Sequence, residues 1–177
     1  PLLQYGQDFT SAGIPQPALL GDVQHQNAAC VVMALQQLAE RLPVSVENIH
    51  QGLQSVSLMG RMQRVHEQPD VIVDVAHNPH AAKELAAWLK KNPLNGKTFA
   101  IFSILADKDI AGVVEVMSAE LDEWHVVSLS GSRALSSDVL ADKIKASGVK
   151  VPIYTYSDFQ SAWNSVHLSA EKQARVV

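Results

Sequence analysis

The most informative stretch of the chain is Val71-Ile-Val-Asp-Val-Ala-His-Asn-Pro-His-Ala-Ala82, in which an apolar β-branched run passes directly into a helix start. The run Val71–Val75 is typical of a strand covered on both faces, as strands of a parallel sheet are. Asn78 is a favoured N-cap, and Pro79 is a favoured first helical residue. The stretch therefore predicts a strand, a short loop and a helix, which together begin a βα unit.

The same alternation continues to the end of the chain. Strands are predicted at 71–75, 99–102, 125–129 and 153–156, and helices at 79–91, 110–121, 137–147 and 158–172. Arg175-Val-Val177 has the pattern of a further strand just beginning. Strands that alternate with helices predict an α/β fold, here a Rossmann-like, mostly parallel sheet flanked by helices.

The residues before this region have a different pattern. Residues 1–20 mix Gly, Pro, Gln and Ser without a sustained period, which indicates loop and short strand. Residues 27–41 are apolar around most of a helical circumference and predict a largely buried helix, with Cys30 as a small core residue. Ser45 can cap a second helix at 46–56. We therefore expect two parts, a partly helical one at 1–64 and the sheet domain at 65–177.

Composition excludes several classes of protein. Of 177 residues, 14 are Lys or Arg and 18 are Asp or Glu, so the net charge of −4 gives no electrostatic case for binding nucleic acid. The longest apolar run, 28–35, is far short of the ~20 residues that span a bilayer. The one cysteine excludes an intramolecular disulfide or a Cys-based zinc site. We expect a cytoplasmic monomer that binds small molecules and neither nucleic acid nor membrane.

Asp74 and His77 are the candidate functional residues of the first strand and loop. Helix capping explains the two residues after His77, but it does not explain a carboxylate in an apolar strand, which costs several kcal/mol unless it is paired or used. Ligands of open parallel sheets bind at the carboxyl ends of the strands. His80 is more typical of a solvated first helical turn. The pair His77-x-x-His80 lacks a third ligand, so the sequence predicts no metal site.

Further polar groups follow the later strands. Asp107-Lys-Asp109 comes directly after the apolar run Phe99–Leu105 that contains the second predicted strand, and Ser130-Gly-Ser-Arg133 and Ser157 come directly after the third and fourth. Acidic residues before a helix are also explained by the helix dipole, so these groups are less specific signals. Because the strands are predicted to be parallel, we expect all of these loops to lie at one edge of the sheet.

Two residues before the sheet domain are open to two interpretations. Arg61, which follows Gly60, suits either a solvated surface or a phosphate, which a guanidinium binds in bidentate fashion. Asn27 suits either a helix N-cap or the edge of a nucleobase, because its amide offers both an acceptor and donors. The sequence contains no G-x-x-x-x-G-K-[ST] phosphate-binding loop.

The stretch Asp74-Val-Ala-His-Asn-Pro-His-Ala-Ala82, with Gly60-Arg61 before it and Asp107-Lys-Asp-Ile110 after it, closely resembles the bacterial bifunctional dihydrofolate synthase/folylpolyglutamate synthases. These enzymes belong to the Mur ligase superfamily. The resemblance spans essentially the whole chain. It implies that 65–177 is a Mur ligase C-terminal glutamate-ligase domain cut at its last strand. It also implies that 1–64 is the last part of the central ATP-binding domain.

The resemblance implies an ATP-dependent ligase that adds L-glutamate to dihydropteroate and to the glutamyl tail of tetrahydrofolate through an acyl phosphate. ATP and Mg²⁺ are the implied cofactors, with the magnesium ligands expected upstream of this chain. By matched position, Asn27 would contact adenine, Arg61 the phosphates and Asp74 the ribose, while His77 would lie near the phosphate and the incoming glutamate. His77 and Arg61 are the implied catalytic residues. Since the phosphate loop and the magnesium ligands are missing, we expect no activity from this chain alone.

Two other functions fit the same residues. The first is another Mur-type amino-acid ligase, which would share the Asp-x-x-His-Asn edge but use a different acceptor. The second is a stand-alone nucleotide-binding module without chemistry. A phosphate loop in the upstream reading frame would favour a ligase over the module.

Overall fold

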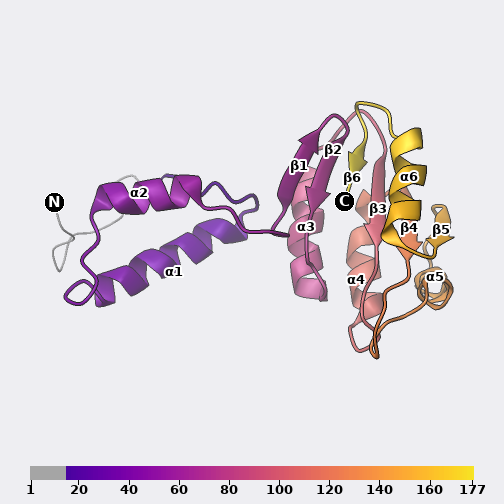
Figure 1. The fold of residues 1–177 in the computed structure, drawn as a ribbon, viewed down its shortest axis with the longest axis horizontal. Coiled ribbons are helices and arrows are strands. Elements are labelled where there is room, and N and C mark those ends of the chain that lie inside the picture. The colour runs from indigo at the N-terminus through magenta and orange to yellow at the C-terminus, as the bar shows by residue number, and fades with distance from the viewer. Residues whose placement is uncertain (1–14) are drawn as a thin grey trace. The chain divides into compact units, whose positions relative to one another are not determined.

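The computed structural model describes residues 15–177, and the chain divides into two units, Pro1–Gln63 and Arg64–Val177 (Figure 1). Helices α1 (Val23–Gln37) and α2 (Val46–Ser55) belong to the first unit. The remaining elements are, in chain order, β1 (Gln63–Glu67), β2 (Asp70–Val73), α3 (Pro79–Lys91), β3 (Thr98–Phe102), α4 (Ile110–Met117), the 3₁₀ helix η2 (Ser118–Glu120), β4 (Glu123–Val127), α5 (Ser137–Ala146), β5 (Ile153–Tyr156), α6 (Phe159–Ser169) and β6 (Arg175–Val176). None of the described helices has the length and apolar character that crossing a membrane requires.

Helices α1 and α2 pack against each other through a small apolar cluster. Ala28 and Val32 of α1 meet Ile49 and Leu53 of α2 in this cluster. The start of α2 is as predicted, since the Ser45 hydroxyl accepts a hydrogen bond from the backbone N–H of the third residue along, at 3.2 Å.

The prediction that α1 is largely buried is wrong for the described residues. Val31 and Met33 are 53% and 63% exposed, and Cys30 is exposed rather than a core residue. An apolar pattern shows which side chains can be buried, whereas only the α2-facing side of α1 has a partner in the described part of the chain. The helix also begins at Val23, earlier than predicted, so Asn27 lies inside it and is not its N-cap.

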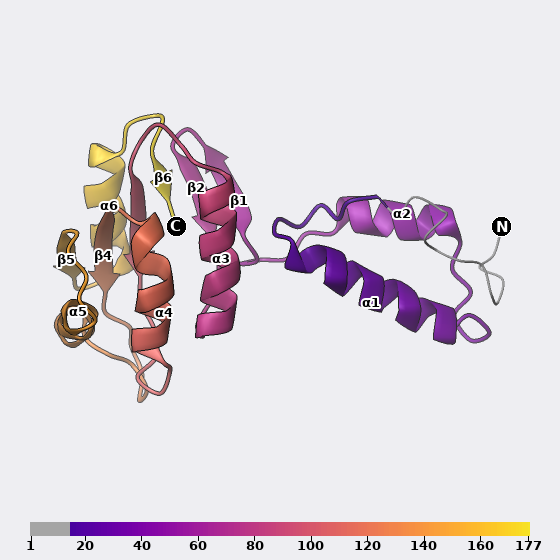
Figure 2. The same cartoon turned by 180° about the vertical axis from the view of Figure 1, so that it is seen from behind.

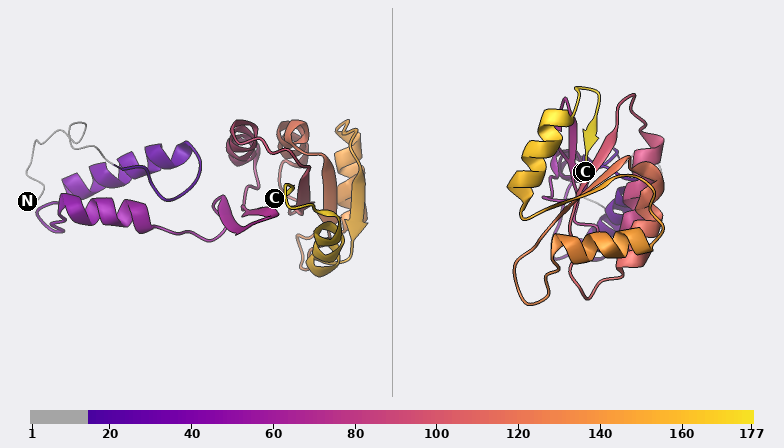
Figure 3. Two further views of the ribbon diagram at one scale, coloured as in Figure 1. Left: turned by 90° about the horizontal axis from the view of Figure 1, so that it is seen from above. Right: turned by 90° about the vertical axis from the view of Figure 1, so that its right-hand side faces the viewer.

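The second unit contains a six-stranded sheet with the order β1-β2-β6-β3-β4-β5. Strands β2, β6, β3, β4 and β5 are parallel, so the predicted mostly parallel sheet is confirmed. Helices α3 and α4 cover one face and α6 covers the other (Figures 2 and 3). The α6 side of the core is formed by Val166 with Val71, Phe99 and Val176.

Strand β1 was missing from the sequence prediction. Its residues, Gln63-Arg-Val-His-Glu67, are mostly polar, and all of them after the first are exposed. Such an edge strand carries no apolar run, because it is not buried on either face. The predicted strand at 175–177 is confirmed as β6, which lies between β2 and β3.

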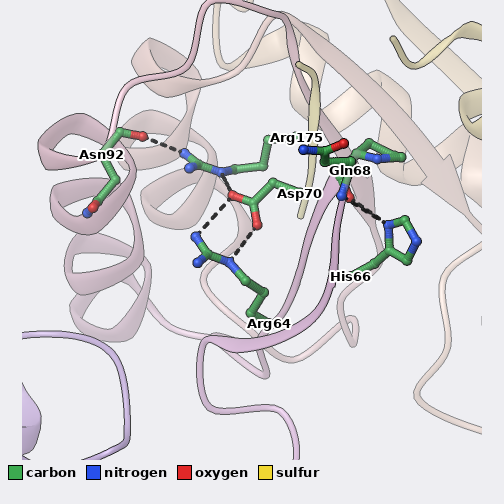
Figure 4. A network of polar contacts seen from close by, with 7 residues as sticks. Arg64, His66, Gln68, Asp70, Asn92 and Arg175 are labelled. Carbon is green, nitrogen blue, oxygen red and sulfur yellow. Dashed lines mark hydrogen bonds and ion pairs between the residues drawn. The ribbon is translucent and has the colours of Figure 1, made fainter. Parts of the chain in front are cut away.

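A buried ion pair joins β6 to β2 (Figure 4). Arg175 Nε donates to Asp70 Oδ2 at 2.8 Å, and Arg175 Nη1 donates to the carbonyl oxygen of Asn92 at 2.9 Å. The same guanidinium lies 4.9 Å from the centre of the Trp88 ring. Arg64 Nε approaches the other carboxylate oxygen of Asp70, also at 2.8 Å. The charge of Arg175, whose side chain is only 2% exposed, is therefore fully accommodated by a carboxylate, a carbonyl and an aromatic face.

A second buried polar group is His125 on β4. Its ring stacks against Tyr154 and Tyr156 of β5, with centroid distances of 5.1 and 5.7 Å. Its Nδ1 lies 3.0 Å from the Tyr156 hydroxyl, and its Nε2 lies 3.5 Å from Glu123 Oε2. Burial lowers the pKa of the His125 imidazole below its ordinary value of 6.5, and the Glu123 carboxylate opposes this only in part.

The first prediction compares the two arginines that share Asp70. Arg175→Met should lower the free energy of unfolding by about 3–5 kcal/mol, because it leaves a buried carboxylate without its buried partner. Arg64→Met, at a side chain that is 45% exposed, should cost about 1 kcal/mol or less. Urea unfolding of the three proteins measures both losses. Equal losses would mean that burial of Arg175 does not govern the stability of the pair.

The second prediction concerns the loss of folding stability at acidic pH. Because the folded state holds His125 with a lowered pKa, the unfolded state binds more protons below about pH 6.5, and stability should fall as the pH drops through this range. His125→Phe keeps the stacking and should reduce the slope of stability against pH by up to about 1.4 kcal/mol per pH unit. Unfolding at a series of pH values between about 4.5 and 7.5 measures it. His25→Gln, at an exposed position in α1, is the control, and an unchanged slope in His125→Phe would refute the prediction.

Candidate functional site

The loop between β2 and α3 carries the principal candidate residues. Strand β2 ends at Val73, so Asp74 lies just beyond the strand and is half-buried, not inside it as predicted. Its Oδ1 accepts a hydrogen bond from the backbone N–H of Ala76 at 2.7 Å. The main chain of the loop therefore orients this carboxylate.

His77 is exposed, and a main-chain contact orients its ring as well. Nδ1 lies 3.0 Å from the carbonyl oxygen of Val75. A carbonyl oxygen can only accept, so Nδ1 carries the hydrogen and Nε2 is the unprotonated nitrogen of the neutral ring. The loop thus presents an imidazole nitrogen that can accept a proton.

The helix after this loop begins as predicted. Asn78 Oδ1 accepts from the N–H of Ala81 at 2.9 Å, and Pro79 is the first helical residue. His80 is exposed in the first turn. The described residues contain no group of three or more His, Cys, Asp or Glu that could hold a metal ion.

The loops after β3 and β4 lie together, as predicted from the parallel sheet. Arg133 Nη1 is 3.4 Å from Asp107 Oδ2, and the N–H of Ala106 donates to the carbonyl oxygen of Arg133 at 2.9 Å. Lys108 Nζ lies 3.8 Å from the same carboxylate oxygen. These side chains are substantially exposed, so their pairing positions charge at the sheet edge more than it stabilises the fold.

Two of the other predicted edge residues belong to helix starts, Asp109 as a cap and Ser157 as a hydrogen-bond partner of a cap. Asp109 Oδ1 accepts from the N–H of Gly112 at 3.0 Å at the start of α4. Ser157 Oγ donates to Asp158 Oδ2 at 2.8 Å, and Asp158 caps α6. The backbone N–H of Ser161 is the main cause that lowers the pKa of the Asp158 carboxyl. Asp109 therefore caps α4, and Ser157 supports the carboxylate that caps α6.

The starts of α3 and α4 approach each other closely at Gly112. A Cβ atom on this residue would lie 2.7 Å from Pro79 Cγ and 2.5 Å from Asp109 Oδ2. The absence of a side chain therefore allows the loop that carries Asp74 and the loop that carries Asp107 to be neighbours. A cavity of about 70 Å³ under this edge is lined by Asp74 and Ala76, together with Phe102, Trp124 and Val177.

Arg61 and Asn27 both belong to the first unit, Pro1–Gln63. Arg61 is exposed, and its turn includes Gly60 and Met62, which both have positive φ. Met62 is buried and packs on Gly21, where a Cβ would be 2.8 Å from Met62 Cε. The turn that carries Arg61 therefore lies against the start of α1, the helix that carries Asn27.

Asn27 lies on the rim of an apolar groove between α1 and α2. The groove has a volume of about 410 Å³ and is lined mainly by aliphatic side chains, among them Val31, Leu35, Val44 and Leu53. Asn27 Nδ2 donates to Gln24 Oε1 at 3.0 Å, and Gln24 lines the same groove. Sequence reasoning missed Gln24, although its i, i+3 spacing from Asn27 was available as a signal.

The fold is that of a doubly wound α/β domain, a class of protein whose ligands bind at the carboxyl ends of the strands. Residues 60–177 match the family described as the glutamate ligase domain of Mur ligases. The chain belongs to this family.

Curated relatives agree with this assignment. The chain is 40% identical over 131 residues to the dihydrofolate synthase/folylpolyglutamate synthase of Escherichia coli K12, a match that covers 74% of this chain and 28% of that protein. It is 38% identical over 138 residues to the protein of the same name from Haemophilus influenzae, with coverage of 68% and 31%. The chain therefore spans less than a third of the length of these relatives.

Solved structures are similar as well. E. coli FolC in complex with ADP, without folate substrate, has a TM-score of 0.79 and 34% identity, covering 92% of this chain and 37% of that chain. The bifunctional folylpolyglutamate synthase/dihydrofolate synthase from Yersinia pestis, complexed with AMPPNP and Mn ion, has a TM-score of 0.77 and 38% identity, covering 93% and 37%. The resemblance stated from the sequence motifs is confirmed.

The third prediction tests the close approach of the two loops. Gly112→Ala should lower the melting temperature, because the new methyl group overlaps Pro79 and the capping carboxylate of Asp109. Gly52→Ala in α2 is the matched control, since a Cβ there meets nothing within 4 Å. That change should stabilise the chain by about 0.5–1 kcal/mol. Stabilisation by both substitutions would show that the loops have room to separate.

Proposed function

We propose that this chain is part of a cytoplasmic, monomeric ligase that adds L-glutamate to dihydropteroate and to the glutamyl tail of tetrahydrofolate. ATP supplies the phosphoryl group that activates the acceptor carboxylate, which is otherwise a poor acyl donor. The proposal rests chiefly on the loop after β2, where Asp74 and His77 are both held by main-chain contacts at the carboxyl end of the strand. The relatives and their nucleotide complexes support it.

In this proposal, residues 1–64 form the last part of a central ATP-binding domain and residues 65–177 form the glutamate-ligase domain. The magnesium ligands are proposed to lie upstream of this chain. The net charge of −4 offers no electrostatic attraction for nucleic acid, and small molecules are the proposed ligands.

Three residues would bind the nucleotide. Asn27 lies on the rim of an apolar groove large enough for a purine, and its amide can bond to the edge of the base. Arg61 is exposed and would bind phosphate through its guanidinium fork. Asp74 is an acceptor and would receive a hydrogen bond from a ribose hydroxyl.

His77 is the proposed proton acceptor. The amine of glutamate arrives as an ammonium group and must lose a proton before its nitrogen can attack the acyl phosphate. Nε2 of His77 is unprotonated in the neutral ring, because Nδ1 donates to the Val75 carbonyl. The nitrogen–carbon bond then forms as the carbon–oxygen bond to phosphate breaks. The nitrogen gives up its second proton to the departing phosphate, which leaves as hydrogen phosphate, and the first proton remains on the imidazole. The His77 imidazolium would also stabilise negative charge on the departing phosphate.

Phosphate release that requires both glutamate and dihydropteroate tests the function in the full-length enzyme. Release with a different carboxylate acceptor but not with dihydropteroate would identify another Mur-type ligase. Nucleotide binding without any release would indicate a binding module. The 177-residue chain alone should show no turnover, because differential stabilisation of a transferring phosphoryl group needs a phosphate loop and metal ligands that this sequence lacks.

The fourth prediction separates Asp74 from His77 in the full-length enzyme. Asp74→Asn should mainly raise KM for ATP, because the amide is a weaker acceptor for the ribose hydroxyl. His77→Ala should mainly lower kcat, because the proton acceptor is lost. Steady-state kinetics with varied ATP measure both. If each residue were structural only, both variants would melt at lower temperature with near-normal kinetics, and a reversal of the two effects would exchange the assigned roles.

The fifth prediction concerns Arg61. Arg61→Ala in the full-length enzyme should lower turnover by about 10²-fold or more, the range seen when one donor to transition-state charge is removed. Arg61→Lys should restore only part of it, since an ammonium group cannot reproduce the bidentate fork. Wild-type turnover in either variant would place Arg61 on a solvated surface without a role in catalysis.

A further inference from the structure

Gln24 and Asn27 form a hydrogen-bonded amide pair on the rim of the α1–α2 groove. They lie three residues apart on α1, and Asn27 Nδ2 donates to Gln24 Oε1 at 3.0 Å. Both side chains line the groove, whose floor is aliphatic. The two amides are therefore polar groups on the rim of a mainly apolar groove that is large enough for a purine.

In this structure the hydrogen bond places the nitrogen of the Asn27 amide, and not its oxygen, on the Gln24 side. An asparagine amide has one acceptor oxygen and two N–H donors. Gln24 Oε1 accepts from one of the two N–H groups. The second N–H and the oxygen Oδ1 remain as an adjacent donor and acceptor in a defined order.

We propose that Gln24 is a positioning residue that makes the groove selective for adenine over 6-oxopurines. Adenine presents an amino group at N6 and an acceptor at N7, which match the Oδ1 and the second N–H of Asn27. Guanine and hypoxanthine present an oxygen at position 6, which would face Oδ1 as a second acceptor. This inference rests on the proposed function, in which Asn27 contacts the base.

A purely structural role for the same bond makes a different prediction. Hydrogen bonds between side chains one turn apart on a helix surface stabilise the helix by about 0.2–0.5 kcal/mol. Loss of Gln24 would then change stability slightly and leave base selectivity unchanged. The ratio of affinities for two purine nucleotides separates the two roles, because helix stability affects both nucleotides equally.

The experiment measures the dissociation constants of ATP and ITP for the full-length enzyme by titration calorimetry. The two nucleotides differ at position 6 of the base, so their ratio reports the contact to Oδ1. A single mismatched bidentate contact corresponds to roughly a ten- to hundredfold preference for ATP in the wild type. Loss of affinity for 7-deaza-ATP would report the second contact, to N7.

Substitutions at position 24 distinguish acceptor, donor and apolar side chains. Gln24→Glu keeps an acceptor and should keep the preference for ATP. Gln24→Met has similar length but no amide, and its ATP-to-ITP preference should fall about tenfold or more, toward equality. In Gln24→Lys the ammonium group would donate to Oδ1 of Asn27 and so reverse the Asn27 amide. The nucleotide preference should then shift toward ITP. Gln37→Met, the same change at an exposed position near the end of α1, is the control and should keep the wild-type ratio.

The outcomes separate this inference from the proposed function. If Asn27→Ala leaves both dissociation constants unchanged, Asn27 does not contact the base and both assignments fail. If Asn27→Ala removes the preference but Gln24→Met retains it, the base site stands and only the role of Gln24 is overturned. Circular dichroism checks the folding of each variant, and the Glu and Lys variants decide the question if the Met variant does not fold.

Discussion

The buried ion pair between Asp70 and Arg175 is the interaction on which the arrangement of the sheet depends. In the order of the sheet, β2 and β3 do not neighbour each other, and each pairs with β6 instead. Because β6 is only two residues long, it offers few backbone hydrogen bonds to either side. The Arg175 side chain adds contacts to the Asp70 carboxylate, the Asn92 carbonyl and the Trp88 ring. These contacts hold β6 to β2 and to the end of α3.

The ion pair and the candidate site lie at opposite ends of the same strands. Asp70 is the first residue of β2, whereas Asp74 follows the last. At that second end, Val177 accepts from the N–H of Ile101 at 2.8 Å and lines the same small cavity as Asp74. The buried charges therefore stabilise the sheet where no ligand is proposed, and the polar loops project from a scaffold that is already fixed.

Sequence reasoning succeeded where the determinants are local and failed where they are distant. The caps at Ser45 and Asn78 and the alternation of strands and helices depend on residues a few positions apart, so a single sequence reveals them. Asp70 and Arg175 are 105 residues apart, and nothing in either neighbourhood indicates the other. At the site, the prediction that Asp74 needs a partner is confirmed, and the N–H of Ala76 is one partner in this structure. That choice depends on the strand ending at Val73, and strand ends are the least defined feature of a sequence pattern.

A common feature of three proposed ligand-binding side chains is that each is oriented by a contact close in sequence. Asp74 is held by the N–H of Ala76, His77 by the carbonyl of Val75 and Asn27 by the amide of Gln24. Ordering a free side chain on binding costs about 0.5–1.5 kcal/mol, so a side chain oriented beforehand retains more of its interaction energy. Arg61 differs, because the described residues provide no hydrogen-bond or ion-pair partner for its guanidinium. The Arg61 side chain is therefore ordered only when an anion binds. The attraction between the guanidinium and the anion must exceed the free-energy cost of this ordering before Arg61 contributes to affinity.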